Sequence, residues 1–202
     1  MPQGNLFIVS APSGAGKTSL VAELLRRNTN VKASISHTTR PRRPGEQNGV
    51  NYHFIDKAKF LQMIDEKLFL EHALVFSHYY GTSKTWVIET LAQGVNVILE
   101  IDWQGAEQAR AKFPNNESIF ILPPSIQALE DRLNNRGQDD PSVIAKRISA
   151  AREEMTHYSE ADYVIVNDDF NVALKNLELI IQKQHSSNVT SFDKALIKKL
   201  LS

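Results

Sequence analysis

The stretch SAPSGAGKTS, residues 10–19, decides the fold, and it lies between the apolar run LFIV at 6–9 and a helical pattern. It matches the phosphate-binding formula GxxxxGK[ST], except that Ala11 stands where the formula has glycine. Such a loop points successive backbone N–H groups at phosphate oxygens, with a helix N-terminus behind them. Gly14 and Gly16 occupy the positions of close approach, and Ala11 is tolerated if its φ stays negative. We therefore predict a working phosphate-binding loop.

The residue types in this loop predict their roles with a bound nucleotide, although ATPases, GTPases and kinases all share such a loop. Lys17 is expected to reach the β- and γ-phosphates, and the Thr18 hydroxyl is expected to ligate Mg²⁺. The alternative is a glycine-containing turn that binds nothing, which the intact Gly-x-Gly-Lys-Thr pattern disfavours. The residues expected to bind phosphate in this loop, and assigned to ATP by the family resemblance given below, are Ala11, Pro12, Ser13, Gly14, Ala15, Gly16, Lys17 and Thr18.

Four short apolar runs, each nearly continuous, are typical of strands buried on both faces of a parallel sheet. They are LFIV at 6–9, VNVIL at 95–99, IFIL at 119–122 and YVIV at 163–166. Helical patterns separate or follow them, after the loop and at 83–93, 104–112, 125–135, 171–183 and 192–201. This alternation predicts an α/β fold, with a P-loop-containing, doubly wound parallel sheet as its core.

Two segments do not fit the alternation. Residues 34–82 combine basic, aromatic and turn residues with short alternating apolar pieces, which predicts a small inserted subdomain of mixed strands. Residues 136–157 read as a polar turn and a charged helix, with Asp140 as N-cap and Pro141 as first helical residue, and we expect a helical lid there. The core then comprises 1–33, 83–135 and 158–202.

The composition excludes several classes of function. Lysine plus arginine equals aspartate plus glutamate, at 23 each, whereas a general nucleic-acid binder would show a basic excess. The absence of cysteine excludes disulfides and zinc–thiolate sites. No apolar run approaches the ~20 residues that span a bilayer, and the N-terminal MPQGN lacks the features of a signal peptide. We expect a cytosolic protein that binds neither nucleic acid nor a membrane, as a monomer or a homo-oligomer.

A second anion site is indicated by SISHTTRPRRPGEQNGVNYHF at 34–54. Arg40 and Arg43 lie three residues apart among prolines, which stiffen the segment. Paired guanidinium groups offer forked donors to a phosphate, and Tyr52 adds a phenolic donor. A solvated basic face is the alternative that these residues alone leave open.

The ordered set of motifs resembles the guanylate kinases, of the nucleoside monophosphate kinase group, essentially from end to end. The matching stretches are SAPSGAGKTSL, SHTTRPRRPGEQNGVNYHF, FLEHALVFSHYYGTS, VILEIDWQGA, RLNNRG, KRISAAREEM and YVIVNDD. The resemblance implies transfer of the ATP γ-phosphoryl group to GMP and dGMP, with Mg²⁺ as cofactor and ATP as co-substrate. It also implies that the inserted subdomain binds the monophosphate and that the lid closes over ATP.

Residue roles follow from the resemblance, position by position. It implies that Arg40, Arg43, Tyr52 and Tyr80 hold the GMP phosphate, and that Ser36, Glu71 and Thr82 read guanine. Of Glu100 and Asp102, one is implied to support Mg²⁺ and one to hold the acceptor; we assign Glu100 to the metal and Asp102 to GMP, although the motif leaves the choice open. Arg132, Arg136 and Asn167 are implied to contact ATP, with Asp168 near its adenine. The residues implied to be catalytic are Lys17, Arg40, Arg136 and Arg147.

Two other functions remain as alternatives at this stage. One is a different small-molecule kinase on the same scaffold, such as a ribose bisphosphate kinase, which would give no reason for Ser36, Glu71 and Thr82. The other is a non-catalytic guanylate-kinase-like binding module, which would have no need of the intact loop residues Lys17 and Thr18.

Overall fold

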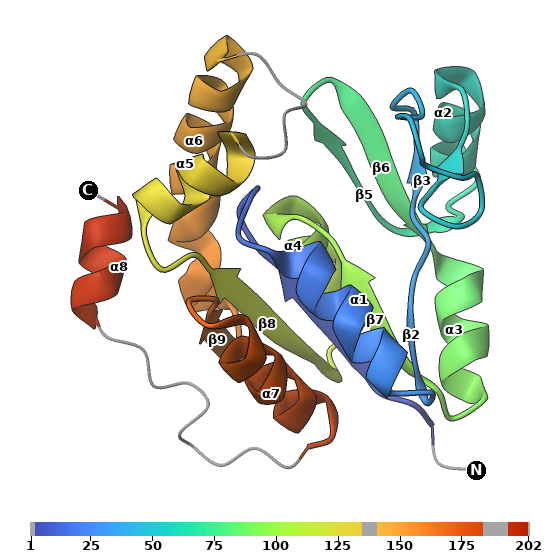
Figure 1. The fold of residues 1–202 in the computed structure, drawn as a ribbon. Coiled ribbons are helices and arrows are strands. Elements are labelled where there is room, and N and C mark those ends of the chain that lie inside the picture. The colour runs from blue at the N-terminus through green and yellow to red at the C-terminus, as the bar shows by residue number, and fades with distance from the viewer. Residues whose placement is uncertain (1–2, 135–140, 184–193, 202) are drawn as a thin grey trace. The chain divides into compact units, whose positions relative to one another are not determined.

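A five-stranded sheet has the strand order β2-β7-β1-β8-β9 in the computed structural model, which describes residues 3–134, 141–183 and 194–201 (Figure 1). β2 pairs with β7 in parallel, and β8 pairs with β9 in parallel. All five residues of β1 are buried, as are the last five of β8, in agreement with their continuous apolar runs. The strands are β1 (Leu6–Ser10), β2 (Val31–Ala33), β7 (Asn96–Glu100), β8 (Asn116–Leu122) and β9 (Tyr163–Val166).

A second sheet has four strands in the order β4-β3-β6-β5. It is mixed, because β3 runs parallel to β4 and antiparallel to β6, which also pairs antiparallel with β5. The turn between β5 and β6 has positive φ at both Phe76 and Ser77, as the tight turns of two-residue hairpins require. Its strands are β3 (His37–Thr38), β4 (His53–Phe54), β5 (Phe69–Val75) and β6 (His78–Ser83).

The chain divides into two compact units, of which the first comprises residues 1–8 and 30–116. It contains the four-stranded sheet with α2 (Lys57–Asp65), α3 (Lys84–Ala92) and α4 (Trp103–Lys112). Asp56, Ser83 and Asp102 cap these three helices by accepting hydrogen bonds from backbone N–H groups of the first turn. Its core joins residues of β5, α3, β7 and α4, including Leu70, Val87, Leu99 and Ala106.

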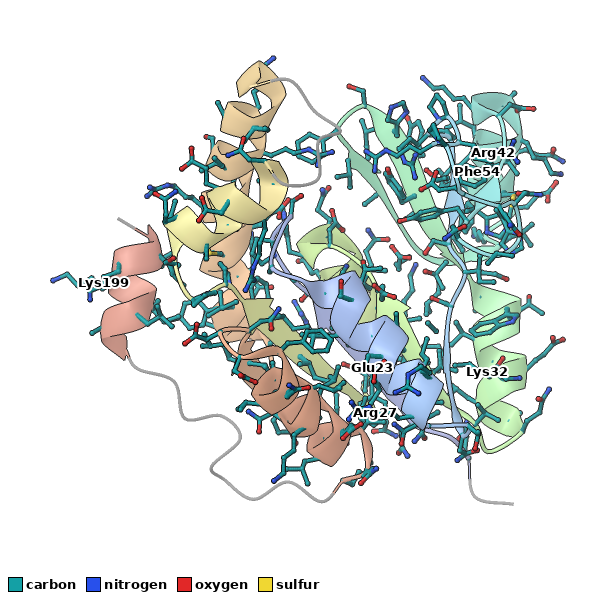
Figure 2. The ribbon with its side chains drawn as sticks, in the orientation of Figure 1. Glu23, Arg27, Lys32, Arg42, Phe54 and Lys199 are labelled. Carbon is teal, nitrogen blue, oxygen red and sulfur yellow. The ribbon has the colours of Figure 1, made fainter. Side chains whose placement is uncertain are left out.

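The second unit comprises residues 9–29 and 117–202. Its helices are α1 (Lys17–Arg27), α5 (Ile126–Asn134), α6 (Pro141–Thr156), α7 (Phe170–Ile181) and α8 (Lys194–Leu201), with a 3₁₀ helix η1 (His157–Glu160). One core cluster joins β8, β9, α6 and α8 through Phe120, Met155 and Ile197. On α8, Ile197 and Leu200 are buried, whereas Lys199 points outward (Figure 2).

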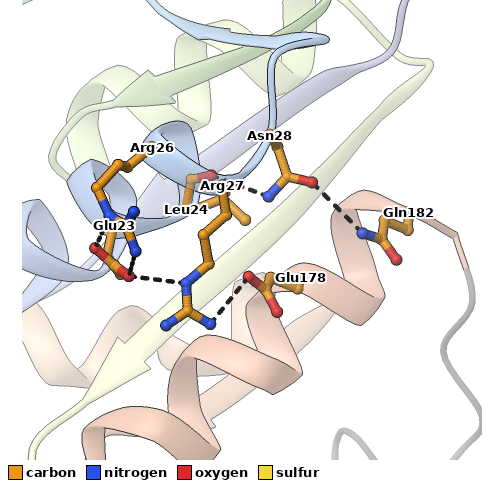
Figure 3. Close-up of polar contacts among 7 residues, drawn as sticks. All are labelled: Glu23, Leu24, Arg26, Arg27, Asn28, Glu178 and Gln182. Atoms are coloured by element: carbon orange, nitrogen blue, oxygen red, sulfur yellow. Dashed lines mark hydrogen bonds and ion pairs between the residues drawn. The ribbon is translucent and has the colours of Figure 1, made fainter.

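Polar side chains connect α1 to α7 at the surface of the second unit (Figure 3). Glu23 accepts hydrogen bonds from Arg26 and Arg27, and these bonds lower the pKa of Glu23 to about 2. Arg27 also lies 3.6 Å from Glu178 Oε1 on α7, and Gln182 Nε2 donates to Asn28 Oδ1. The helix that begins at the phosphate-binding loop is therefore tied to α7 at its C-terminal end.

These observations confirm the predicted fold class: an α/β fold with a parallel sheet and a separate small sheet of mixed strands. The predicted strand runs coincide with β1, β7, β8 and β9, whereas β2 and α2 were not anticipated. α6 begins at Pro141, but Asp140 lies outside the described residues. The predicted domain boundaries and the lid function of 136–157 stay predictions. No helix of the described part is long and apolar enough to cross a membrane.

Candidate active site

The loop over 10–18 has the backbone that the sequence predicts. Gly14 and Gly16 have φ of +91° and +95°, a region that favours glycine. A Cβ on Gly16 would lie 2.3 Å from Asn167 Nδ2, so a side chain is excluded on steric grounds as well. Ala11 is not among the described residues with positive φ, which explains why it can replace the glycine of the formula.

The Ala15 carbonyl is anchored from behind by two side chains. Asn167 Nδ2 donates to Ala15 O at 2.7 Å, and Arg132 Nη1 donates to the same oxygen at 3.2 Å. Arg132 Nη2 also donates to the Asn167 carbonyl at 2.9 Å. Asn167 is only 4% exposed, so this contact is shielded from water. Fixing this carbonyl helps to fix the direction of the neighbouring N–H groups, since the peptide unit is planar.

A third contact comes from α6. The backbone N–H of Ser13 donates to Glu154 Oε2 at 3.1 Å. Glu154, like the bracing role of Arg132 and Asn167, was not anticipated from the sequence. A residue that contacts a main-chain group carries no local pattern that would have indicated it.

A cavity of about 380 Å³ lies beside the loop. This volume falls within the range of small-molecule pockets. Phe170, 38% exposed, gives the cavity an apolar wall, and Asp168 gives it a carboxylate. The residues that line it are Gly14, Gly16, Ser19, Arg132, Asn167, Asp168 and Phe170. The structure therefore brings Arg132, Asn167 and Asp168, all predicted to lie near ATP, together with the loop around one cavity.

In the first unit, Arg40 lies against the aromatic rings of Tyr52 and Phe54. Its guanidinium carbon is 5.4 Å from the ring centre of Tyr52, and the rings of Tyr52 and Tyr80 lie 5.9 Å apart. Arg40 Nη2 donates to Glu46 Oε1 at 2.6 Å. Burial would lower the pKa of Arg40, but the hydrogen bond and charge of Glu46 raise it, so the guanidinium stays charged. Three residues that were predicted to bind the phosphate, Arg40, Tyr52 and Tyr80, thus lie together, and we call this cluster the Arg40 corner.

Glu46 also orders the loop that carries Arg43. Its second oxygen, Oε2, accepts a hydrogen bond from the Arg43 backbone N–H at 2.7 Å, while the Arg43 side chain is exposed. Burial raises the pKa of Tyr52, so its phenol remains a protonated donor at neutral pH. Glu46 was missed in the sequence analysis, although its spacing of three from Arg43 in a proline-rich turn was available as a signal.

The sheet register aligns the three predicted guanine-reading residues. Glu71 on β5 is directly opposite Thr82 on β6. His37 is opposite Gly81, so extending the antiparallel β3–β6 register by one residue places Ser36 opposite Thr82. Residues opposite each other in a ladder face the same side of the sheet. Ser36, Thr82 and Glu71 therefore form a row across three adjacent strands.

Glu71 is a buried carboxyl, with 2% of its surface exposed. Burial raises the pKa of Glu71 to about 7, and nearby Asp102 adds to this, whereas the Thr82 hydroxyl and Lys112 act against it. Thr82 is fully buried, and its Oγ1 lacks a hydrogen-bond partner of good geometry among the described residues. A buried hydroxyl without a hydrogen-bond partner of good geometry is costly. The row of Ser36, Thr82 and Glu71 can therefore offer polar atoms to a bound ligand.

Asp102 and Gly105 shape the space around Glu71. Asp102 Oδ1 accepts from the Gly105 backbone N–H at 2.9 Å, and Asp102 Oδ2 accepts from Gln104 Nε2 at 3.1 Å. A Cβ on Gly105 would lie 2.5 Å from Glu71 Oε2, so only glycine leaves room for the carboxylate. Glu100, at the end of β7, is half-buried.

The remaining predicted residues are placed as follows. Lys17 is the first residue of α1, and Thr18 after it is exposed. Arg147 is half-buried on α6. Arg136 lies outside the described residues.

The described ranges contain no group of three or more His, Cys, Asp or Glu side chains that could hold a metal. This is compatible with Mg²⁺, which is bound in phosphate-transfer sites by one or two protein oxygens together with substrate phosphates and water. The Thr18 hydroxyl is a hard oxygen donor of the kind that Mg²⁺ accepts.

Comparisons with known proteins identify the family of the chain. A family model described as guanylate kinase matches residues 3–184. The chain is 54% identical to a guanylate kinase of Saccharophagus degradans, covering 100% of this chain and 99% of that protein. It is 57% identical to one of Vibrio cholerae, covering 91% and 90%. The crystal structure of guanylate kinase from Anaplasma phagocytophilum superposes with a TM-score of 0.77, at 31% identity over 94% of this chain and 90% of that one.

Proposed function

The chain belongs to the guanylate kinase family and has guanylate kinase activity, and we propose that it phosphorylates GMP and dGMP from ATP through the residues described above. The alternatives of a ribose bisphosphate kinase and of a non-catalytic module are set aside by full-length identity with guanylate kinases and by the intact loop. A cytosolic location stays a prediction.

The Arg40 corner is the proposed site for the GMP phosphate. Arg40 and Tyr52 supply a charged fork and a phenolic donor, and Tyr80 lies beside them. The exposed Arg43 is free of any ion pair within the described ranges and is proposed as the second fork. The phosphate would replace the Glu46 carboxylate as the partner of Arg40, because both are anions that a guanidinium binds in the same way.

The row of Ser36, Thr82 and Glu71 is the proposed site for guanine, and the buried Glu71 is the observation that carries the proposal. The Watson–Crick edge of guanine presents two donors, N1–H and the 2-amino group, and an ionised carboxylate offers two acceptors. The buried Thr82 hydroxyl lies close enough to the Glu71 carboxyl to lower its pKa, and it can make a further hydrogen bond when the base enters. Asp102 is proposed to help hold the acceptor nucleotide.

The loop and its neighbouring cavity are the proposed ATP site. Loop N–H groups and Lys17 would hold the phosphates, and the cavity beside Phe170 would hold the nucleoside. Arg132 and Asn167 would keep the loop in shape through Ala15 rather than act on ATP alone. Arg147, and Arg136 outside the described residues, are proposed to reach the ATP phosphates from the lid.

The family uses Mg-ATP, and Thr18 is the residue proposed to bind Mg²⁺ directly, with Glu100 supporting it through water. When bound, Mg²⁺ neutralises charge on the phosphate oxygens. The protein's own contribution is positioning and electrostatic stabilisation by Lys17 and the arginines. No general base is needed, because the acceptor phosphate is already ionised at neutral pH. Exclusion of water prevents hydrolysis of ATP.

Glu71→Gln tests the proposed guanine site. A coupled assay with GMP, dGMP, IMP and AMP is expected to show strong preference for GMP and dGMP in the unmodified protein. Glu71→Gln should lower kcat/KM for GMP by roughly 10²-fold or more, because one acceptor becomes a donor facing a donor. Glu66→Gln, an exposed position on the same unit, is the control. Unchanged GMP preference in Glu71→Gln would overturn the assignment.

A further inference from the structure

The outer edge of β5 is covered by side chains of α4. β5 is the last strand of the four-stranded sheet, so one of its edges has no strand partner. Gln108 Oε1 accepts from the His72 backbone N–H at 3.2 Å, and Gln108 Nε2 donates to the His72 carbonyl at 2.7 Å. One carboxamide therefore satisfies both backbone groups of His72, as a residue of an additional strand would do.

A second side chain of α4 acts one position before Glu71. Lys112 Nζ donates to the Leu70 carbonyl at 2.5 Å. The two residues that flank Glu71 in the chain are thus both held by α4, through three hydrogen bonds. Since the peptide units on either side of Glu71 are planar, fixing them restricts where its Cα and side chain can lie.

The same helix also fixes the other carboxylate of the site. Asp102 is the N-cap of α4 and is oriented by Gly105 N–H and Gln104 Nε2. Gln104, Gln108 and Lys112 lie at a spacing of four, so they form one stripe along α4. This stripe faces Asp102 at one end and β5 along the rest. α4 therefore sets the position of Glu71 and Asp102 together.

We propose that Gln108 and Lys112 are positioning residues for base selection, which hold Glu71 where its two oxygens meet the two donors of guanine. The proposal rests on the proposed role of Glu71. Hydrogen bonds weaken steeply when their angle departs from linear, so a small displacement of the carboxylate weakens two bonds at once. ATP does not use this carboxylate, so the effect should be confined to the acceptor nucleotide.

A purely structural role makes a different prediction. Covering an exposed sheet edge also protects it from pairing with other chains. If that were the whole function, loss of Gln108 would lower stability and reduce activity toward every substrate alike. The two roles are therefore separated by selectivity, not by activity alone.

Gln108→Met tests the proposal, since methionine has similar length and no strong hydrogen-bonding groups. We expect the KM for GMP to rise about tenfold, as for the loss of one to two hydrogen bonds. The KM for ATP should change less than about twofold. The ratio of kcat/KM for GMP over IMP, which lacks the 2-amino group, should also fall. Glu107→Met, an exposed neighbour on α4, is the matched control and should retain all these values.

Lys112→Met gives an independent arm, and it serves if Gln108→Met does not fold. It removes the bond to Leu70 and also the positive charge that lowers the pKa of Glu71, so it is assayed at a pH well above 7, where Glu71 is ionised. Each single variant is combined with Glu71→Gln in a double-mutant cycle. The proposal is supported if Gln108→Met and Lys112→Met raise the KM for GMP in the otherwise unmodified protein but not in Glu71→Gln. Effects that add fully, or that fall equally on GMP, IMP and ATP, overturn it. Loss of selectivity in Glu71→Gln without any change in Gln108→Met and Lys112→Met would overturn this proposal alone and leave the guanine site standing.

Discussion

The burial of Glu71 and its proposed role favour opposite protonation states of its carboxyl in the free protein. Burial favours its neutral form and raises its pKa to about 7, whereas its proposed role needs the ionised form. Guanine supplies two donors to the carboxylate, and such bonds favour the charged state. Binding of GMP should therefore lower the pKa of Glu71.

This coupling predicts a pH dependence. As the pH falls below about 7, Glu71 takes up a proton and loses one acceptor, so the KM for GMP should rise. The phosphate of GMP also titrates in this range, so the profile is compared with that of Glu71→Gln, which retains only the phosphate contribution. Identical profiles for the two proteins between pH 5.5 and 8, the interval ~1 unit or more to either side of this pKa, would contradict the prediction.

The free energy of unfolding should also depend on pH through the ionisation of Glu71. A carboxyl whose folded pKa is raised, here from 4.5 to about 7, stabilises the fold fully below pH 4.5. That stabilisation is lost as the pH rises through 7, and it amounts to about 3 kcal/mol for such a shift. The free energy of unfolding of the unmodified protein minus that of Glu71→Gln should therefore fall by about 3 kcal/mol as the pH rises from 4.5 to above 7.

Strands that the sequence marks with a continuous apolar run were predicted, whereas β2 and α2 were not. The continuous apolar runs indicated β1, β7, β8 and β9, because buried parallel strands need no polar alternation. β2 has three residues, of which only Val31 is buried, so it has too few positions to show a period. α2 lies in a segment read as strands, although Asp56 caps it and Phe60 and Ile64 lie at helical spacing.

At the contact between α1 and α7, we expect apolar packing to outweigh the ion pairs of Figure 3. Arg27 is 42% exposed in its side chain, so water and salt weaken its attraction to Glu178. Arg27→Met should change the free energy of unfolding by less than about 1 kcal/mol. Leu177→Ala, at a fully buried position of α7, should cost about 2–5 kcal/mol. Chemical denaturation of both variants measures this, and an equal cost would contradict it.

On the scale of the whole molecule, the described residues proposed for the two substrates fall into different compact units. The Arg40 corner and the Glu71 row belong to residues 30–116, whereas the phosphate-binding loop and its cavity belong to 9–29 and 117–202. Each nucleotide therefore has a separate set of proposed ligands, apart from Glu100, which is proposed for the metal and lies in the first unit. The sequence could suggest these sets, because their residues carry charge or chemistry that a motif displays.

Other parts of the site could not be predicted in this way. Glu154 contacts a main-chain atom of the loop, and Gln108 contacts main-chain atoms of β5. Asn167 was named for ATP, but its contact with the Ala15 carbonyl was not anticipated. Backbone N–H and C=O groups are the same in nearly every residue type. The sequence therefore does not show which of them a side chain contacts. Only the folded arrangement shows which side chains hold the loop and which hold Glu71.

Amide hydrogen exchange should distinguish the two sets of ligands. GMP alone is expected to slow exchange in β5 and β6, because a ligand that binds the folded state suppresses local opening around its site. A non-hydrolysable ATP analogue with Mg²⁺ should instead slow exchange around 13–20. AMP at the same concentration serves as the control for GMP. Protection of the loop by GMP as strong as that by the ATP analogue would contradict this division.

At the proposed phosphate site, the Glu46–Arg40 ion pair would make GMP binding a substitution of one anion for another. Glu46 is a competitor that cannot diffuse away, so its effective concentration at Arg40 stays high even when it has been displaced. A singly charged ligand has little advantage over this tethered carboxylate, whereas the doubly charged phosphate of a nucleotide does. The Arg40 corner would therefore favour a doubly charged ligand. Guanosine, which has no phosphate, would leave the Glu46–Arg40 ion pair intact.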